Sequence, residues 1–295
     1  MAKGRRSKTG ITGKKGATVD DGRDKSADQP AAGPGDWKAA RAWMAGVASA
    51  TLIAAIGVVF TAWYTTSGPD TIDHIRGEPP LTVGHVAVDY DERPLVLREP
   101  VTTPADRAIL LGRGADPADV AAMLARHHVA TIGDMTTTVV LVGNRSSLRI
   151  IDIKPRVLTR APPAQGAYLN PGSASGQTDT VELIADLDRR PVRFGTKKEL
   201  RTPYFRTKQI DLKRDERVTL SLSIVGETAY YEFDLVATVL TADRSEEIVI
   251  HGPGGVPFRL TGPASSYRTA YRAAGYGGGW VPMPTDQTCT TSDKC

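Results

Sequence analysis

Side chains that could act together in catalysis or metal binding are scattered along this chain, which holds five histidines and two cysteines. His127 and His128 are adjacent, so on a helix they would point about 100° apart and could not easily share one metal face. We expect them to end a helix, where cations suit the negative end of its dipole. Asp186 and Asp188 fall on one side of an expected strand and could hold a cation. The two arginines that follow them favour a solvated strand edge instead.

Two glycine-rich segments come close to catalytic motifs without completing them. Segment 172–176 has alanine where a nucleophile elbow needs serine. Segment 13–15 lacks the upstream glycine spacing and the hydroxyl residue of a phosphate-binding loop. The zinc-protease and Cys-x-x-Cys motifs are absent, and no dinucleotide-binding motif follows an expected strand. The sequence therefore predicts no catalytic residue, no cofactor and no metal centre.

The two cysteines, Cys289 and Cys295, lie close together at the end of the chain. In an oxidising compartment they could form a disulfide that closes a short loop, worth at most about 2 kcal/mol. Free thiols or intermolecular bridges are the alternatives.

Four aromatic residues lie in a Gly- and Tyr-rich segment, 266–295, that we expect to be flexible. They are Tyr267, Tyr271, Tyr276 and Trp280. Tyr and Trp outside a strand pattern are typical of contact surfaces. This segment, or the long polar loop 161–178, is therefore the predicted contact for an envelope protein or polymer.

A membrane span gives the strongest signal in the sequence. Residues 43–64 are 22 consecutive uncharged residues, and a helix of about 33 Å would cross a hydrocarbon core of about 30 Å. We assign 37–66 to a transmembrane anchor helix with aromatic and basic residues at its ends: Trp43, Trp63, Tyr64, Lys38 and Arg41. A buried core helix and a cleavable signal peptide are the alternatives, but the run is longer than a signal peptide's apolar region.

The charge of the chain divides at this span. Residues 1–36 form a polar, basic tail that is predicted to be disordered, because it cannot bury enough apolar surface to fold. Residues 1–42 hold ten basic and five acidic residues, a net +5, and the remainder holds 27 basic and 28 acidic residues, a net −1. The positive-inside rule then places the N-terminus in the cytoplasm and the C-terminal domain outside the cell membrane. We therefore expect the tail to contact lipid, and we expect no nucleic-acid partner.

Small residues recur at every fourth position within the span, at Ala42, Gly46, Ala50 and Ala54. Such a stripe lets two helices approach closely and could support a homodimer. The alternative is that an alanine-rich chain shows this spacing by chance.

Beyond the span, the hydrophobic pattern mostly has the period of strands. Apolar runs at 81–90 and 95–101 flank turn residues and predict one β-hairpin, and those at 218–224 and 231–239 predict another. Further strands are expected at 135–142, 148–158, 180–187, 247–251 and 257–261. One short helix is marked by Asp116 as its N-cap and Pro117 as its first residue.

The predicted fold class is mainly β, with an antiparallel β-sandwich of the immunoglobulin-like kind as the outer domain. An enclosed barrel is the alternative. The predicted parts are a stalk, hairpin and short helix at 67–130, the sandwich at 131–265 and the flexible C-terminal segment at 266–295.

Several residues in this outer region carry a resemblance: Pro203-Tyr204-Phe205, Leu212, Glu216, Val218, Pro257-Phe258 and Thr261. With the Asp116-Pro117 helix and the Thr-rich strand after it, the region 80–270 resembles the outer domain of uncharacterised single-pass membrane proteins of high-GC actinobacteria. The resemblance implies a β-rich outer domain on a single anchor and implies no activity.

The sequence as a whole predicts a membrane-anchored, extracytoplasmic binding or assembly module of the cell envelope, without catalysis. Its predicted partners are the lipid bilayer and an envelope protein or polymer. The alternatives are an envelope hydrolase with dispersed catalytic residues and a transmembrane signalling adaptor.

Overall fold

The computed structural model describes residues 70, 73, 75–90, 93–171, 182–196, 199, 202–242, 244–275 and 279–288. They belong to one compact unit that runs from Phe60 to Cys295. Within these ranges, no helix combines the length and the apolar character that crossing a membrane requires. The predicted disordered tail at 1–36 and the predicted anchor at 37–66 lie outside the described residues.

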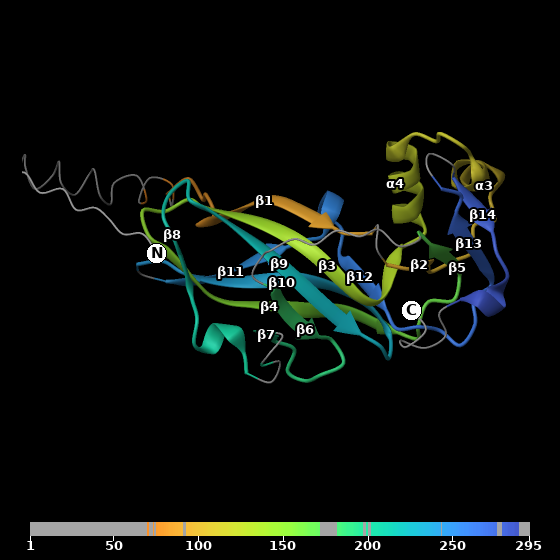
Figure 1. Ribbon diagram of the computed structural model, residues 1–295. Coiled ribbons are helices and arrows are strands. Elements are labelled where there is room, and N and C mark those ends of the chain that lie inside the picture. The colour runs from red at the N-terminus through yellow and green to blue at the C-terminus, as the bar shows by residue number, and fades with distance from the viewer. Residues whose placement is uncertain are drawn as a thin grey trace, which may run out of the picture. The chain divides into compact units, whose positions relative to one another are not determined.

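The described residues are mainly β, as predicted, with fourteen strands and two α-helices (Figure 1). The helices are α3 (Pro104–Leu111) and α4 (Pro117–Arg126). The strands are β1 (Leu81–Val88), β2 (Leu95–Leu97), β3 (Ala130–Gly143), β4 (Leu148–Ala161), β5 (Ala167–Asn170), β6 (Glu182–Asp186), β7 (Phe194–Thr196), β8 (Ile210–Leu212), β9 (Arg217–Gly226), β10 (Tyr230–Leu240), β11 (Ser245–Ile250), β12 (Phe258–Thr261), β13 (Thr269–Ala273) and β14 (Trp280–Pro282). Three short 3-10 helices lie at Tyr204–Arg206, Pro253–Gly255 and Thr285–Gln287.

The long strand β3 belongs to two groups of strands. Near its start it pairs with β2 and β12, both of which meet it at Thr131. From Gly133 onward it pairs with β9, and from Thr137 onward also with β1. Because β6 pairs with β9 and β7 pairs with β6, the first group has the order β1-β3-β9-β6-β7.

Strand β10 is the centre of the second group. One of its edges pairs with β4 from Tyr230 to Leu240, and β8 pairs with the other side of β4. The opposite edge of β10 pairs first with β12 and then with β11. β10 is therefore hydrogen-bonded on both edges along nearly its whole length.

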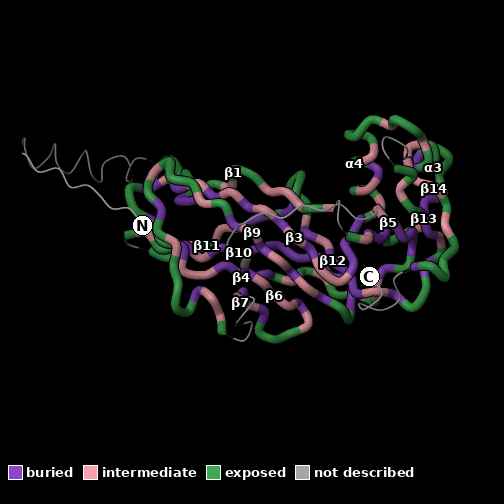
Figure 2. The backbone as a smooth tube through the Cα atoms, viewed as in Figure 1, coloured by how far each residue is buried: buried purple, intermediate pink, exposed green. Residues whose placement is uncertain are grey.

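One hydrophobic core contains buried side chains from both groups, and buried residues lie along strands of both groups in Figure 2. The contributors include Val139, Leu141, Leu222 and Ile224 from the first group and Ile150, Ile153, Phe233 and Leu235 from the second. The Phe233 and Phe258 rings stack with their centroids 5.5 Å apart. Two smaller clusters lie around β2, β5 and β13, where the Tyr168 and Tyr267 rings are 5.1 Å apart and where α4 buries Met123.

Each helix begins with a side-chain cap. Asp116 accepts a hydrogen bond from the Ala118 N–H at the start of α4, as predicted. At the start of α3, which the sequence analysis did not predict, Thr103 accepts one from the Asp106 N–H. The Thr-Pro-x-Asp sequence there is a recognisable helix start.

Asp106 also joins the two helices. Its carboxylate is 2.5 Å from Arg126 and 3.1 Å from the Nε2 atom of His127. These contacts, with the Thr103 hydroxyl, lower the pKa of Asp106 to about 2. His127 is the C-cap of α4, in agreement with the expected helix end.

Neither predicted hairpin forms. β1 and β2 pair with β3 one after the other, so the segment between them runs along β3 instead of reversing the chain. The Asp89 N–H donates to the Thr136 carbonyl oxygen, and the Ile132 N–H donates to the Pro94 carbonyl oxygen, both at 3.0 Å. β9 and β10 likewise enter different groups, because the long pairing of β10 with β4 outweighs the local turn signal.

The strand pairing is mixed, so the predicted fully antiparallel arrangement is wrong. β3 runs parallel to β12, β5 to β13, and β6 to β9. β5 and β13 also fall in 161–178 and 266–295, the segments expected to lack regular structure. These short strands bury Tyr168 and Tyr271. The high glycine and proline content predicted irregular structure, but burial of the two large aromatic side chains stabilises strands here.

The shared core predicts that substitutions at two positions on the paired strands β10 and β4 lower the free energy of unfolding by very different amounts. Phe233→Ala removes a ring that is 0% exposed, and we expect a loss of about 3–5 kcal/mol in the free energy of unfolding. Leu158→Ala on β4, where the side chain is 50% exposed, should cost under about 1 kcal/mol. Urea denaturation of both variants checks this, and equal losses would contradict the core assignment.

Candidate functional site

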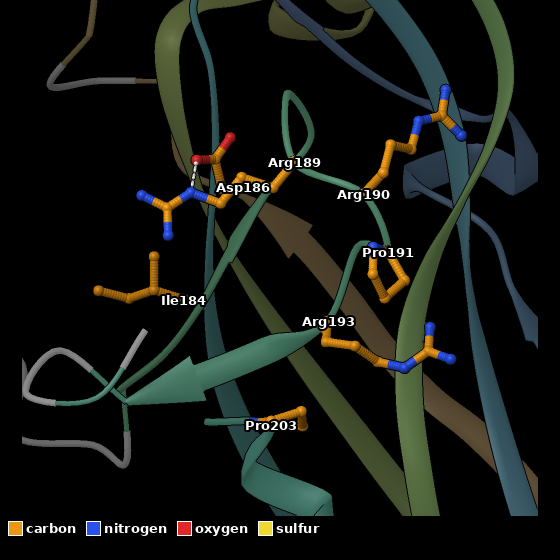
Figure 3. A pocket seen from close by; sticks show the side chains of 7 residues that line it. All are labelled: Ile184, Asp186, Arg189, Arg190, Pro191, Arg193 and Pro203. Atoms are coloured by element: carbon orange, nitrogen blue, oxygen red, sulfur yellow. Dashed lines mark ion pairs between the residues drawn. The ribbon is translucent and has the colours of Figure 1, made fainter. Parts of the chain in front are cut away.

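An arginine-lined hollow of about 230 Å³ lies at the connection between β6 and β7 (Figure 3). It is lined by Ile184, Asp186, Arg189, Arg190, Pro191, Arg193 and Pro203. Pockets for drug-sized ligands measure about 300–1,000 Å³. The hollow therefore suits a single charged group or a small ring, with an apolar surface supplied by Ile184 and the two prolines.

Asp186, the last residue of β6, holds the first turn of this connection. Its carboxylate is 2.8 Å from the Nε atom of Arg189 (Figure 3) and accepts a 2.9 Å hydrogen bond from the Asp188 N–H. An aspartate that bonds the backbone two residues further on forms an Asx-turn. The turn thus fixes one arginine and compensates its charge.

Asp188 ties the same connection to the crossing between β9 and β10. Its carboxylate accepts hydrogen bonds from the Glu227 N–H at 2.6 Å and from the hydroxyls of Thr228 and Tyr231. Partial burial raises the pKa of Asp188, but these hydrogen bonds to the charged form outweigh it, so the pKa is lowered. These contacts fix the backbone that carries Arg189 and Arg190, so less of the connection has to be ordered when a ligand binds.

The remaining two arginines differ in how far their charges are compensated. Arg193 donates to the Val192 carbonyl oxygen at 2.9 Å, and its Nε atom is 3.9 Å from Asp152. Arg190 is exposed and forms no ion pair with a described residue. Among the residues that line the hollow, three arginines stand against one carboxylate, that of Asp186. The planar guanidinium group binds carboxylate or phosphate oxygens through two parallel hydrogen bonds, so the hollow suits an anion.

The cation site considered for Asp186 and Asp188 does not form. The Asp186 carboxylate pairs with Arg189, and that of Asp188 is occupied by hydroxyl and backbone donors. Across the described ranges, no group of three or more His, Cys, Asp or Glu side chains is arranged to hold a metal ion.

A second charged cluster lies where the end of α4 meets β10 and β12. Glu232 accepts hydrogen bonds from the Tyr230 hydroxyl at 2.9 Å and from Arg259 at 3.1 Å, and it lies 3.8 Å from His128. Burial and the neighbouring Glu232 carboxylate raise the pKa of Tyr230. The charges in this cluster compensate one another, so it joins the strands to α4 and offers less to a ligand than the hollow does.

One histidine–aspartate pair lies on the second strand group. The Nδ1 atom of His251 is 2.9 Å from Asp234, whose side chain is 4% exposed, and Arg156 is 3.5 Å from the same carboxylate. The His251 side chain itself is half exposed. An aspartate that orients a histidine is one component of a hydrolase site.

The aromatic residues predicted as partner contacts are placed differently from expectation. Tyr267 and Tyr271 are buried, and the Tyr267 hydroxyl accepts a hydrogen bond from the Ala264 N–H. Their predicted exposure is therefore wrong, because both rings complete the cores around β5 and β13. Trp280 is half-buried in β14.

Other predicted residues lie outside the described ones, so their assignments stay predictions. These are Tyr276, the possible disulfide partners Cys289 and Cys295, and the membrane-anchor residues Trp43, Trp63, Tyr64, Lys38 and Arg41.

For Arg189 and Arg190, the sequence predicts only a solvated strand edge and no binding site. The usable signal was the run of two aspartates and two arginines at 186–190, in which each acid could fix the turn. Arg193 and Asp152 could not be linked to it, because they belong to segments about forty residues apart that only the tertiary structure brings together.

The Asp188 contacts predict a pH-dependent contribution to stability. Because the folded-state pKa lies below the unfolded value of about 3.9, the contribution is present above that value and is lost as the pH falls through the lower folded pKa. Asp188→Asn should cost about 1 kcal/mol at pH 7 and progressively less below pH 4. Thermal denaturation between pH 7 and pH 3 measures this, with the exposed Asp286→Asn as the control. A loss that does not change with pH would contradict the assignment.

Comparison with known proteins identifies no relative of this chain. No family model, no curated protein and no solved structure matches it.

Proposed function

We propose that this chain is a membrane-anchored, extracytoplasmic module of the cell envelope that binds an anionic partner and has no catalytic activity. The observation that carries the proposal is the arginine-lined hollow, whose turn is fixed by Asp186 and Asp188 and in which Arg190 forms no ion pair with a described residue. An exposed guanidinium on a fixed turn, beside a small apolar surface, suits recognition of a phosphate or carboxylate on an envelope polymer or protein.

The proposed location follows from the sequence. The anchor at 37–66 would hold the module at the membrane, and the basic tail would stay in the cytoplasm. The small-residue stripe from Ala42 to Ala54 supports a homodimer through the membrane helix as a further proposal.

The proposed finer fold is a β-sandwich of the immunoglobulin-like kind. Its support is the core that the two strand groups share, with Ile224 on one group and Phe233 on the other. Residues from two facing sheets meet in this way in sandwiches. The parallel pairs distinguish this chain from the usual antiparallel arrangement.

If the hollow binds the partner, a double variant that removes two of its arginines should lose affinity for an anionic polymer. Arg190→Gln with Arg193→Gln should weaken retention on an immobilised anionic cell-wall polymer by about tenfold or more, since a charge-assisted hydrogen bond contributes about 1.5–3 kcal/mol. The full chain in lipid nanodiscs is measured by surface plasmon resonance.

The matched control is Arg206→Gln with Lys208→Gln, which removes the same charge from exposed positions that do not line the hollow. Equal weakening by both double variants would indicate general charge attraction and would contradict a specific site.

The proposed orientation can be tested with the only two cysteines of the chain, Cys289 and Cys295. After mild reduction of intact cells, a membrane-impermeant maleimide should label them. In a variant with both cysteines changed to serine and with Ser7→Cys added, the label should appear only after the cells are opened. Labelling of that variant in intact cells would overturn the orientation.

An envelope hydrolase is the second candidate function, and the His251–Asp234 pair is the observation that favours it. If it applies, His251→Gln should abolish release of fragments from purified envelope polymer, whereas the hollow variant should lower it only through binding. Fragment release that survives His251→Gln would remove this candidate.

A further inference from the structure

A second hollow, of about 360 Å³, lies apart from the one described above. It is lined by Arg98, Glu99, Pro100, Thr102, Gln165 and Arg268. These residues come from three segments that are distant in the sequence: the chain after β2, the chain before β5 and the chain before β13. The proposed function does not use this hollow.

Arg98 is held at this hollow by two contacts. Its backbone N–H donates to the His127 carbonyl oxygen at 3.0 Å, at the end of α4. Its guanidinium carbon lies 5.0 Å from the centroid of the buried Tyr230 ring. A cation at this distance from an aromatic ring is attracted to the ring, so the guanidinium is ordered although its residue is exposed.

The segments that carry Gln165 and Arg268 are fixed against each other and against β2. The Arg268 N–H donates to the carbonyl oxygens of Gln165 at 2.9 Å and Gly166 at 3.1 Å. Gly166 packs so closely on the backbone of residues 97–99 that any side chain there would collide with the Leu97 carbonyl oxygen. The separation of the lining segments is thus set by backbone packing.

We propose that this second hollow binds a small molecule that carries one oxyanion group and several hydroxyls, a sugar acid or a polyol phosphate. Two guanidinium groups against Glu99 leave one positive charge, which matches a single carboxylate or phosphate ester. Gln165 and Thr102 add neutral donors and acceptors, and Glu99 can accept hydrogen bonds from ligand hydroxyls.

Saturation-transfer NMR on the full chain in detergent micelles tests this with three probes: glucuronate, glycerol 3-phosphate and uncharged glucose. At least one of the two anions should bind, with Kd at least tenfold lower than for glucose. Arg268→Gln should raise that Kd by about tenfold or more. The matched control is Arg272→Gln, an exposed arginine four residues away on β13 that does not line the hollow.

The pattern of binding decides between outcomes. Binding of glucuronate alone assigns the oxyanion as a carboxylate, and binding of glycerol 3-phosphate alone assigns it as a phosphate; either supports the proposal. Glucose binding as tightly as the anions, neither anion binding, or Arg268→Gln matching Arg272→Gln would each overturn it. The Arg190→Gln and Arg193→Gln double variant should leave this binding unchanged, which separates this hollow from the proposed function. Arg98→Gln is not used to decide the test, because it removes the contact with Tyr230 as well as the proposed ligand contact.

Discussion

The architecture depends on one strand, β3, whose backbone must be hydrogen-bonded on both edges and in both strand groups. Near Thr131 it lies between β2 and β12, and further along it lies between β1 and β9. An unpaired buried backbone group costs about as much as a lost hydrogen bond. Covering two edges of a strand of this length therefore recruits segments from distant parts of the chain. This demand explains why β1 and β2 follow one another along β3 and do not form a hairpin.

The position of the arginine-lined hollow follows from the same pairing. β9 covers one edge of β3, and β6 extends the group by running parallel to β9. The chain then leaves β6 at the end of β9 where the crossing to β10 begins. Asp188 can therefore reach Glu227 and Tyr231 at that crossing. The contact that fixes the connection therefore depends on β6 and β9 ending at the same place.

Local features of this fold could be predicted from the sequence, whereas strand partners could not. The cap at Asp116 and the alternating run of β9 depend on neighbouring residues, and the structure contains both. The partner of β10 depends on burial of its apolar side chains and on β4, about eighty residues away, and no local pattern encodes that choice. The predicted exposure of Tyr267 and Tyr271 was wrong for the same reason. A Gly- and Pro-rich context indicates a loop, and only the tertiary core shows that their rings are buried.

The charge balance determines what kind of recognition these hollows can support. Residues 43–295 carry a net −1, so this part of the chain has no strong overall field to draw an anion from a distance. In addition, salt at physiological ionic strength screens the interaction between exposed charges beyond about 8 Å. The proposed recognition at Arg190, or between Arg98 and Arg268, would therefore depend on guanidinium geometry at contact. A site of this kind would distinguish ligands by the shape of the oxyanion and by the groups beside it. A distributed charge field would not distinguish them by either property. In each hollow the backbone that carries the arginines is fixed, by Asp188 in the first and by the close packing of Gly166 in the second.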